Sequence, residues 1–332
     1  MAWPASFGQR YTIFVDTEEE FDWSAPFDRS NRAISASAAL PPATRRFADL
    51  GAPLALLVDH PIATDPAAIA NVRQALETAG TAIGTQLHPW VNPPFDEDVC
   101  ATNSFAGNLP RDLEAAKLLV LTQAIADAFG ERPRIYRAGR YGLGPNTMGL
   151  LAAQGYAIDS SMRSRYDYSS GGGPDYGAIG NAAFAIGDSG LVELPLTTVY
   201  TGALRSIGPA LDRIAATVPR LTGALARGRM LGRVALTPED MPLRDALEAV
   251  RIVVGDGLPL LNLSFHSPTL VPGHTPYVRS DADLSLFWHW WDGVIGLLDT
   301  LGVHSVGATE LLAAIPCAHS PASVSTTGAV GL

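Results

Sequence analysis

The stretch from Tyr11 to Trp23 constrains the fold more than any other part of the sequence. Tyr11–Val15 is a short, mostly apolar run that predicts a buried strand, and it ends abruptly at Asp16. Residues two apart on an extended backbone face the same side, so we expect Asp16 and Glu18 to share one face. Two carboxylates held this close suit metal binding or acid–base catalysis, although a solvated acidic loop fits this stretch equally well. Further carboxylates follow at Glu19, Glu20 and Asp22.

Short apolar runs alternate with helix-like segments along the rest of the chain. After the first run, strands are expected at 52–58, 81–88, 134–141, 156–159, 191–199 and 258–265. Helices are expected at 36–50, 65–78, 110–129, 146–154, 203–235, 237–254 and 281–301. This alternation predicts a parallel α/β sheet or barrel. We expect one domain over 10–315, preceded by an extension (1–9) and followed by a disordered tail (316–332), which has no pattern.

Polar residues stand at or just past the C-terminal ends of the predicted strands. In a βα barrel these ends converge on one mouth, where the active site lies. The coincidence of so many polar residues with strand ends favours an active site over a solvated loop. The residues are Asp16, Asp59, His60, His88, Arg137, Arg140, Asp159 and His266.

Composition narrows the class of partner. The net charge is −10, and the 23 Lys and Arg residues form no basic runs, so neither nucleic acid nor an anionic membrane surface is expected as a partner. Cys100 and Cys317 are far apart and form no CxxC pair, which favours a reducing compartment. The sequence shows no signal peptide and no apolar run of membrane-spanning length, so we expect a cytoplasmic protein.

The ordered motifs resemble those of the polysaccharide deacetylases with a NodB-homology domain, carbohydrate esterase family four. The similarity runs from roughly residue 10 to residue 310, and the first motif, Val-Asp-Thr-Glu-Glu-Glu-Phe-Asp-Trp, is similar to that of one bacterial branch. The resemblance implies a distorted (β/α)7-type barrel. It also implies hydrolysis of N- or O-acetyl groups on amino sugars or glycans with a divalent metal, usually zinc.

The same resemblance implies roles for single residues. Asp16 matches the catalytic base, and Glu18 matches a metal ligand. Arg137, in Tyr-Arg-Ala-Gly-Arg-Tyr, would hold the base as a two-pronged partner. His266, in Ser-Phe-His-Ser-Pro, would protonate the leaving group, and Asp159 would tune it.

The second motif departs from the family pattern of two histidines. In Gly-Thr-Gln-Leu-His-Pro-Trp, Gln86 takes the place of the first histidine and Trp90 that of the second, with His88 between them. Gln86 and His88 are two apart and can both face the pocket. We therefore expect Glu18, His88 and Gln86 to hold a divalent metal, with zinc the first candidate, although an amide oxygen is a poorer zinc ligand than imidazole.

Residues beside the motifs are candidates for substrate binding. Trp23 and Trp90 could stack on a sugar ring, and Arg140, Tyr141 and His60 lie at strand ends. The resulting hypothesis is a deacetylase acting on an amino sugar or glycan precursor, or on another acetylated small molecule. Two alternatives stay open: a catalytically degenerate barrel that binds a saccharide or a partner, and a hydrolase of a small non-sugar C–N substrate.

Overall fold

The computed structural model describes residues 1–315 apart from 217 and 219. Its main sheet comprises β1 (Arg10–Thr17), β2 (Leu54–Val58), β3 (Ala82–Leu87), β4 (Ile135–Ala138), β5 (Ile158–Asp159), β6 (Phe184–Ala185), β7 (Val192–Glu193), β10 (Leu260–His266) and β11 (His304–Ser305). The order is β10-β1-β2-β3-β4-β5-β7-β6, and β11 pairs with β1. Neighbouring strands are parallel except β6 and β7. The expected parallel α/β architecture is confirmed.

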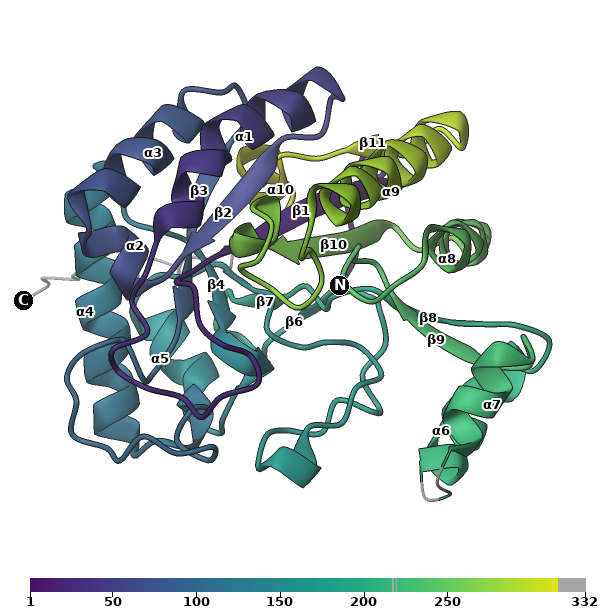
Figure 1. Ribbon diagram of the computed structural model, residues 1–332, viewed down its shortest axis with the longest axis horizontal. Coiled ribbons are helices and arrows are strands. Elements are labelled where there is room, and N and C mark those ends of the chain that lie inside the picture. Colours follow the sequence, from purple (N-terminus) through teal and green to yellow (C-terminus); the bar gives the residue numbers. More distant parts are fainter. Residues whose placement is uncertain (217, 219, 316–332) are drawn as a thin grey trace, which may run out of the picture.

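Helices cover the outside of this curved sheet (Figure 1). They begin where the sequence supplies caps: Asp65 accepts backbone hydrogen bonds ahead of Pro66, and Ser280 forms a capping box with Asp283. The α-helices are α1 (Leu40–Asp49), α2 (His60–Thr64), α3 (Pro66–Leu76), α4 (Arg111–Phe129), α5 (Thr147–Ala153), α6 (Gly208–Ala216), α7 (Leu221–Arg227), α8 (Leu243–Gly255), α9 (Asp281–Thr300) and α10 (Ala308–Ala314). The short 3-10 helices are η1 (Ser35–Ala39), η2 (Ala106–Asn108), η3 (Gly139–Tyr141), η4 (Ser169–Gly171), η5 (Arg205–Ile207) and η6 (Ser267–Leu270).

Alternation along the strands separates two hydrophobic cores. One lies inside the curve of the sheet and includes Phe14, Leu57, Ile135, Ile158 and Leu260. The other fills the space between the sheet and the helices, and draws on the intervening strand residues. Side chains alternate between the two faces of each strand. Polar residues that lie two or four positions beyond these inner core residues therefore also point into the barrel.

The barrel is distorted because its two sides meet through single contacts. Between β7 and β10 the backbone N–H of Thr197 donates to the carbonyl of Asn262 at 3.1 Å. The Asn262 side chain donates to the carbonyl of Leu194 at 2.8 Å. These bonds stand where a strand ladder would close a regular barrel, in keeping with the expected distorted (β/α) type.

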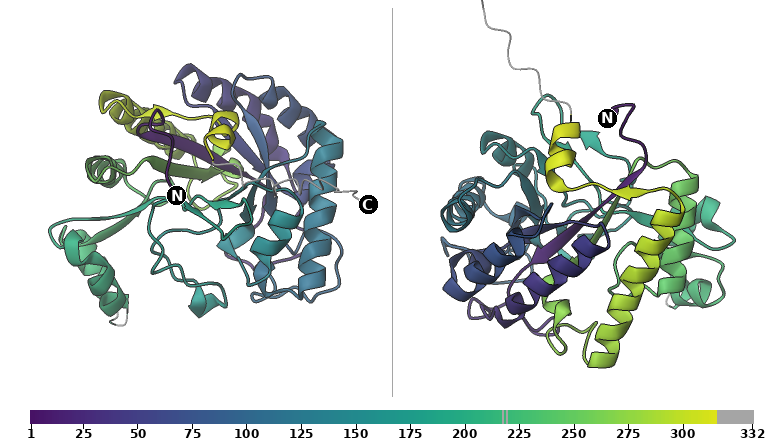
Figure 2. Two further views of the ribbon diagram at one scale, coloured as in Figure 1. Left: turned by 180° about the vertical axis from the view of Figure 1, so that it is seen from behind. Right: turned by 90° about the horizontal axis from the view of Figure 1, so that it is seen from above.

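The stretch 203–235 differs from the single helical segment that was expected. Its last four residues form β9 (Gly232–Ala235), which pairs antiparallel with β8 (Thr198–Thr201). The two strands carry α6 and α7 on an arm that projects from the barrel (Figures 1 and 2). Pairing with β8 overrides the helical composition of this stretch.

No helix in the described part of the chain combines the length and the apolar character that crossing a bilayer requires. The tail expected at 316–332 lies outside the described residues.

Candidate active site

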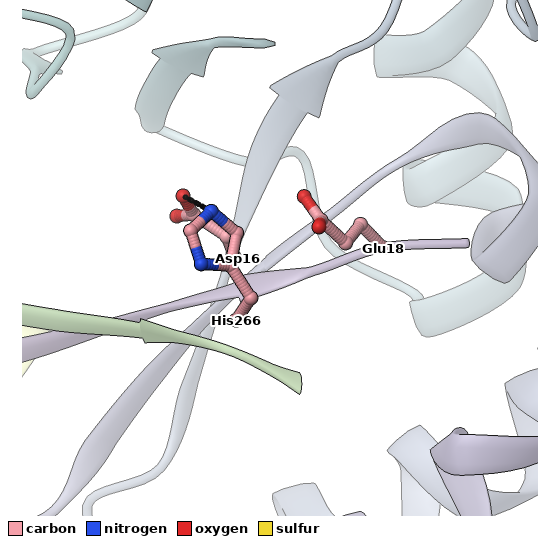
Figure 3. A group of neighbouring side chains, drawn as sticks. All are labelled: Asp16, Glu18 and His266. Atoms are coloured by element: carbon pink, nitrogen blue, oxygen red, sulfur yellow. Dashed lines mark ion pairs between the residues drawn. The ribbon is translucent and has the colours of Figure 1, made fainter. Parts of the chain in front are cut away.

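β1 and β10 end side by side at the barrel mouth, and their register places Asp16 opposite His266. Paired residues on neighbouring parallel strands present their side chains on the same face. Oδ2 of Asp16 accordingly lies 3.5 Å from Nε2 of His266 (Figure 3). The Asp16 side chain is 3% exposed and that of His266 is 17% exposed. The carboxylate is therefore covered by an imidazole that still reaches solvent.

Arg137, on β4, holds the other oxygen of Asp16. Its Nη1 donates to Oδ1 at 2.5 Å. The remaining nitrogen atoms bind Ser160: Nε donates to the carbonyl at 2.9 Å and Nη2 to the hydroxyl at 3.1 Å. The expected two-pronged pairing is therefore wrong, because one prong holds Asp16 and the other edge is anchored on Ser160. Oδ1 is fixed, and Oδ2 is left to face His266.

Glu239 positions His266 from the opposite side of the ring. Its Oε2 lies 2.6 Å from Nδ1 of His266, and its Oε1 accepts from the backbone N–H of the same residue at 2.9 Å. Thr269 donates a further hydrogen bond to Oε1 at 2.8 Å. Burial acts to lower the pKa of His266, but the charges of Glu239 and Glu18 outweigh it and raise the pKa to about 10.

Glu18 faces the end of β3. Nε2 of Gln86 donates to Oε2 of Glu18 at 3.0 Å, and Nε2 of His88 lies 3.5 Å from the same oxygen. All three side chains are buried. Oε1 of Glu18 and Oε1 of Gln86 are also buried, and neither has a hydrogen-bond partner among the residues the structure describes. The structure thus brings the expected metal ligands together and leaves two of their oxygen atoms unpaired.

A buried network fixes the ring of His88. Its Nδ1 lies 2.8 Å from Oε2 of Glu19, and the ring stacks on Trp90 with centroids 4.3 Å apart. Trp90 donates to Oε1 of Glu19 at 2.8 Å, and the Glu19 backbone N–H donates to Asp59 at 2.8 Å. A carboxylate on Nδ1 favours the tautomer whose Nε2 is free of a proton, and this nitrogen is the one that faces Glu18.

Burial also governs the protonation of these acids. It raises the pKa of Glu18 to about 8, against the opposing charges of His266 and His88. It raises the pKa of Glu19 as well. Burial, together with the neighbouring Glu19, raises the pKa of Asp59 well above its usual value. A cation bound at Glu18 would favour its ionised form.

Two groups of side chains bring their ligand atoms within 4.8 Å of one another: Asp16, Glu18 and His266, and Glu19, Asp59 and His88. The second group is already joined by hydrogen bonds among its members and to Trp90. The first borders a cavity of about 480 Å3. An ion that acts on a ligand in this cavity therefore has to be held on the side of Asp16 and Glu18.

Asp159 does not share the face of the sheet that carries this site. The preceding residue, Ile158, belongs to the core inside the barrel, so alternation turns Asp159 towards the helices. Its Oδ1 accepts from the hydroxyl of Ser161 at 2.5 Å. The expected tuning of His266 by Asp159 is wrong, since Glu239 makes that contact.

Four of the five expected substrate-binding residues line the cavity: Trp23, Trp90, Arg140 and Tyr141. Trp23 meets His266 edge-on, with ring centroids 5.0 Å apart, and it is half-buried. Arg140 and Tyr141 both have positive φ, 55° and 60°, which turns the chain sharply at the end of β4. The strand-end pattern therefore located these side chains correctly.

Trp90 offers little surface to a substrate, and His60 lies outside the described lining of the cavity. Trp90 borders the cavity but is 2% exposed, with one ring face against His88. It supports His88 and offers little surface to a sugar. His60 opens α2 and is not among the described residues that line the cavity; its Nδ1 lies 3.5 Å from Arg32.

Two acids with direct roles in this geometry were not assigned from the sequence. Glu239 lies in the first turn of the helix expected at 237–254, whereas α8 begins four residues later at Leu243. Glu19 lies in the acidic run after Asp16, and nothing in that run separates it from its neighbours. Only contacts between residues far apart in the sequence identify the two acids.

Comparison of the sequence with protein-family models and with curated proteins finds no match. Solved structures do match. A protein from Mycobacterium smegmatis assigned as a polysaccharide deacetylase is 16% identical, with a TM-score of 0.50 over 95% of this chain and 92% of its own. A protein from Pseudomonas aeruginosa PAO1 with the same assignment is 12% identical, with a TM-score of 0.50 over 93% and 91%.

The fold is also found in an enzyme of a different kind. A GH57 branching enzyme from Thermococcus kodakaraensis, solved with glucose, is 12% identical, with a TM-score of 0.51 over 92% of this chain and 71% of its own. At these identities the likeness establishes the fold alone. The reaction has to be argued from the site.

Proposed function

We propose that this protein is a metal-assisted hydrolase that removes an acetyl group from an amino sugar or a glycan precursor. The observation that carries the proposal is the arrangement of Asp16. One oxygen is fixed by Arg137 at 2.5 Å, and the other faces Nε2 of His266 at 3.5 Å. A carboxylate base beside an imidazole acid, at the edge of a cavity, has the two groups that acyl transfer to water requires.

The residues present fit a divalent cation. Glu18 and Gln86 each have a buried oxygen atom without a partner among the described residues, and His88 offers a nitrogen that Glu19 keeps free. These three side chains would hold the ion, with Asp16 within reach. The mixture of oxygen and nitrogen donors suits several divalent ions, and zinc is the first to test. When bound, such an ion polarises the acyl carbonyl and lowers the pKa of water.

Asp16 and His266 carry the proton transfers in this proposal. Oδ2 of Asp16 accepts a proton from water as the water oxygen bonds to the acyl carbon. Nε2 of His266 then donates a proton to the leaving nitrogen or oxygen as its bond to the acyl carbon breaks. Glu239 keeps Nδ1 of His266 engaged, so that Nε2 carries the proton that is donated.

The test starts from metal content and acetate release. Protein purified without chelator or nickel resin is compared with His88→Ala for bound metal, and both are assayed on acetylated sugars and on cyclic amides. We expect near-stoichiometric metal that is lost in His88→Ala, together with acetate release from a sugar.

Each opposite outcome has a clear consequence. Absence of metal in both proteins, even after exposure to zinc, manganese or cobalt, would overturn the metal-assisted reaction. Hydrolysis of the cyclic amides alone would assign the site to a non-sugar C–N substrate. Saccharide binding without acetate release would assign it to a catalytically degenerate barrel.

A further inference from the structure

Arg163 lies in the loop that follows β5, and its side chain lines the cavity. Tyrosine rings hold its guanidinium group. The Cζ atom lies 4.0 Å from the ring centroid of Tyr166 and 5.6 Å from that of Tyr141. Tyr168 lines the same cavity. Cation–π contacts of this kind fix the plane of the group and leave its N–H edges available to a ligand.

Arg163 has no carboxylate partner among the residues the structure describes, and its Nε is buried without a hydrogen-bond acceptor. Two other arginines near the barrel mouth do have such a partner. Arg137 is paired with Asp16 at 2.5 Å, and Arg233 with Asp212 at 2.9 Å. Arg163 is half-buried, and a partly desolvated guanidinium without a counter-charge is unfavourable, so an anion from a ligand would complete its pairing.

The position of Arg163 relates it to the acidic end of the cavity. Asp16, Glu18 and Arg163 line the same cavity, and Tyr141 and Tyr277 form part of its wall. The Arg163 guanidinium lies 5.6 Å from the Tyr141 ring, so it shares the cavity with the reacting groups. A ligand whose acyl group lies against Asp16 could reach Arg163 with a second functional group.

The cavity also limits the size of the ligand. Its volume is about 480 Å3, within the range of pockets that enclose single small molecules. Trp23 and Tyr277 meet edge to face at 5.5 Å on its wall and supply aromatic surface for a sugar ring. A single ring with a substituent suits this space better than an extended polymer.

Resting on the hydrolysis proposed above, we infer that the substrate is a monosaccharide-sized molecule with a carboxylate or phosphate group that binds Arg163. The acetyl group lies at the Asp16 end, and the anion lies against the guanidinium. Arg140 is a second cation on the wall, but its Nη1 is already bonded to the carbonyl of Ala101 at 3.1 Å and to Ser104. Arg163 is therefore the anion-binding residue.

The test compares acetate release from four substrates: N-acetylglucosamine, its 6-phosphate, N-acetylmuramic acid, and the linear hexamer of N-acetylglucosamine. We expect kcat/KM for one of the two anionic monosaccharides to exceed that for the neutral sugar and the hexamer by about tenfold or more, as one charge-assisted bond provides. Arg163→Gln should reduce that preference to about threefold or less, and Arg163→Lys should retain part of it. Which of the two anionic monosaccharides reacts faster shows whether Arg163 binds a phosphate or a carboxylate.

Arg45→Gln is the matched control, since it removes the same charge from an exposed position on α1 and should leave the preference unchanged. The ratio of rates in the wild-type protein needs no variant, so the test stands even if Arg163→Gln does not fold. Equal rates on neutral and anionic sugars, or a faster reaction with the hexamer, would overturn the inference while the deacetylase proposal stands.

Failure of the deacetylase proposal gives a different result, namely no acetate from any substrate. Calorimetry with glucosamine 6-phosphate and glucosamine then tests the anion site directly. Tighter binding of the phosphate that is lost in Arg163→Gln would support the anion site without the reaction. Equal binding of the two ligands would overturn it.

Discussion

The site contains two histidines with closely similar surroundings and different chemistry. Each has Nδ1 against a buried glutamate, at 2.8 Å for His88 and Glu19 and at 2.6 Å for His266 and Glu239. Each has Nε2 at 3.5 Å from a carboxylate of the acidic stretch, Glu18 for His88 and Asp16 for His266. The two pairs differ in the direction in which the surroundings shift the pKa of the supporting glutamate.

Glu239 is held as an anion. Burial acts to raise its pKa, but the charge of His266 and hydrogen bonds from His266 and Thr269 outweigh burial and keep the pKa below its usual value. Glu19 has the opposite balance, because burial raises its pKa despite several hydrogen bonds. The surroundings of His266 therefore favour an imidazolium–carboxylate pair, whereas burial beside His88 disfavours the charged form of Glu19.

In the proposed reaction this difference suits His266 to proton donation and His88 to metal ligation. A protonated Nε2 on a ring that is 17% exposed can give its proton to a leaving group. A ring that is 3% exposed, fixed by stacking on Trp90, presents its nitrogen in one direction, as a ligand must. Similar local geometry thus supports two functions.

The largest effect is expected from the two carboxylates that face the histidines. Asp16→Asn removes the base and should lower kcat/KM by about 10^3-fold or more, while bound metal is retained. Glu18→Gln should remove both metal and activity. Metal analysis beside steady-state kinetics distinguishes the two variants, and loss of metal in Asp16→Asn would instead make Asp16 a ligand.

The next effect concerns the charge on His266. Glu239→Gln removes the anion that raises the pKa of His266 to about 10, so this pKa should fall towards 6.5. The alkaline limb of the pH–rate profile should move to lower pH, with a loss of about 10^2-fold in kcat/KM at alkaline pH. An unchanged limb would show that His266 is not the acid.

We also expect Glu239→Gln to lower the stability of the protein by an amount that depends on pH. The folded-state pKa of His266 lies above its usual value of 6.5, and that of Glu239 lies below its usual value of 4.5. The pair therefore stabilises the protein fully between pH 4.5 and 6.5 and loses this contribution as pH rises to about 10. The difference in unfolding free energy between wild type and Glu239→Gln should therefore be greatest between pH 4.5 and 6.5 and shrink as pH rises above 6.5. Chemical denaturation across this range measures it.

The location of the two histidines and of the carboxylates that face them could be predicted from the sequence. Strand ends are visible as apolar runs that stop at polar residues, and this placed Asp16, Glu18, His88 and His266 together at the barrel mouth. The parallel fold followed from the alternation of strands and helices. Both depend on local patterns that one sequence displays.

The supporting residues could not be predicted, because they depend on strand parity and long-range contacts. Asp159 is the second residue of the two-residue strand β5, which is too short for the sequence to show which face of the sheet the side chain occupies. Glu239 reaches His266 from a loop 27 residues earlier in the chain. Arg163 is identified by the partner it lacks among the described residues, which only three-dimensional structure can show.

A smaller effect is expected on the ligand side. Glu19→Gln weakens the hold on Nδ1 of His88 and should reduce metal affinity by about 10- to 100-fold. The alkaline limb set by His266 should stay in place once metal is saturating. Competition with a chelator, followed by a pH–rate profile at high metal, measures both. A shift of the limb in Glu19→Gln would mean that the two histidines act as one coupled unit.

The smallest effect is expected on the unfolding free energy when the aromatic residue beside each histidine is replaced. Trp90→Phe keeps a ring against His88 but removes the donor to Oε1 of Glu19, which is then buried without that bond. The expected cost is about 1–3 kcal/mol of unfolding free energy. Trp23→Phe, beside His266, changes a half-buried ring for which no hydrogen bond is seen among the described residues, and should cost below about 1 kcal/mol. Urea denaturation of both variants tests this. Equal losses of unfolding free energy in the two variants would contradict the view that Trp90 holds His88 rigidly while Trp23 is an adaptable neighbour of His266.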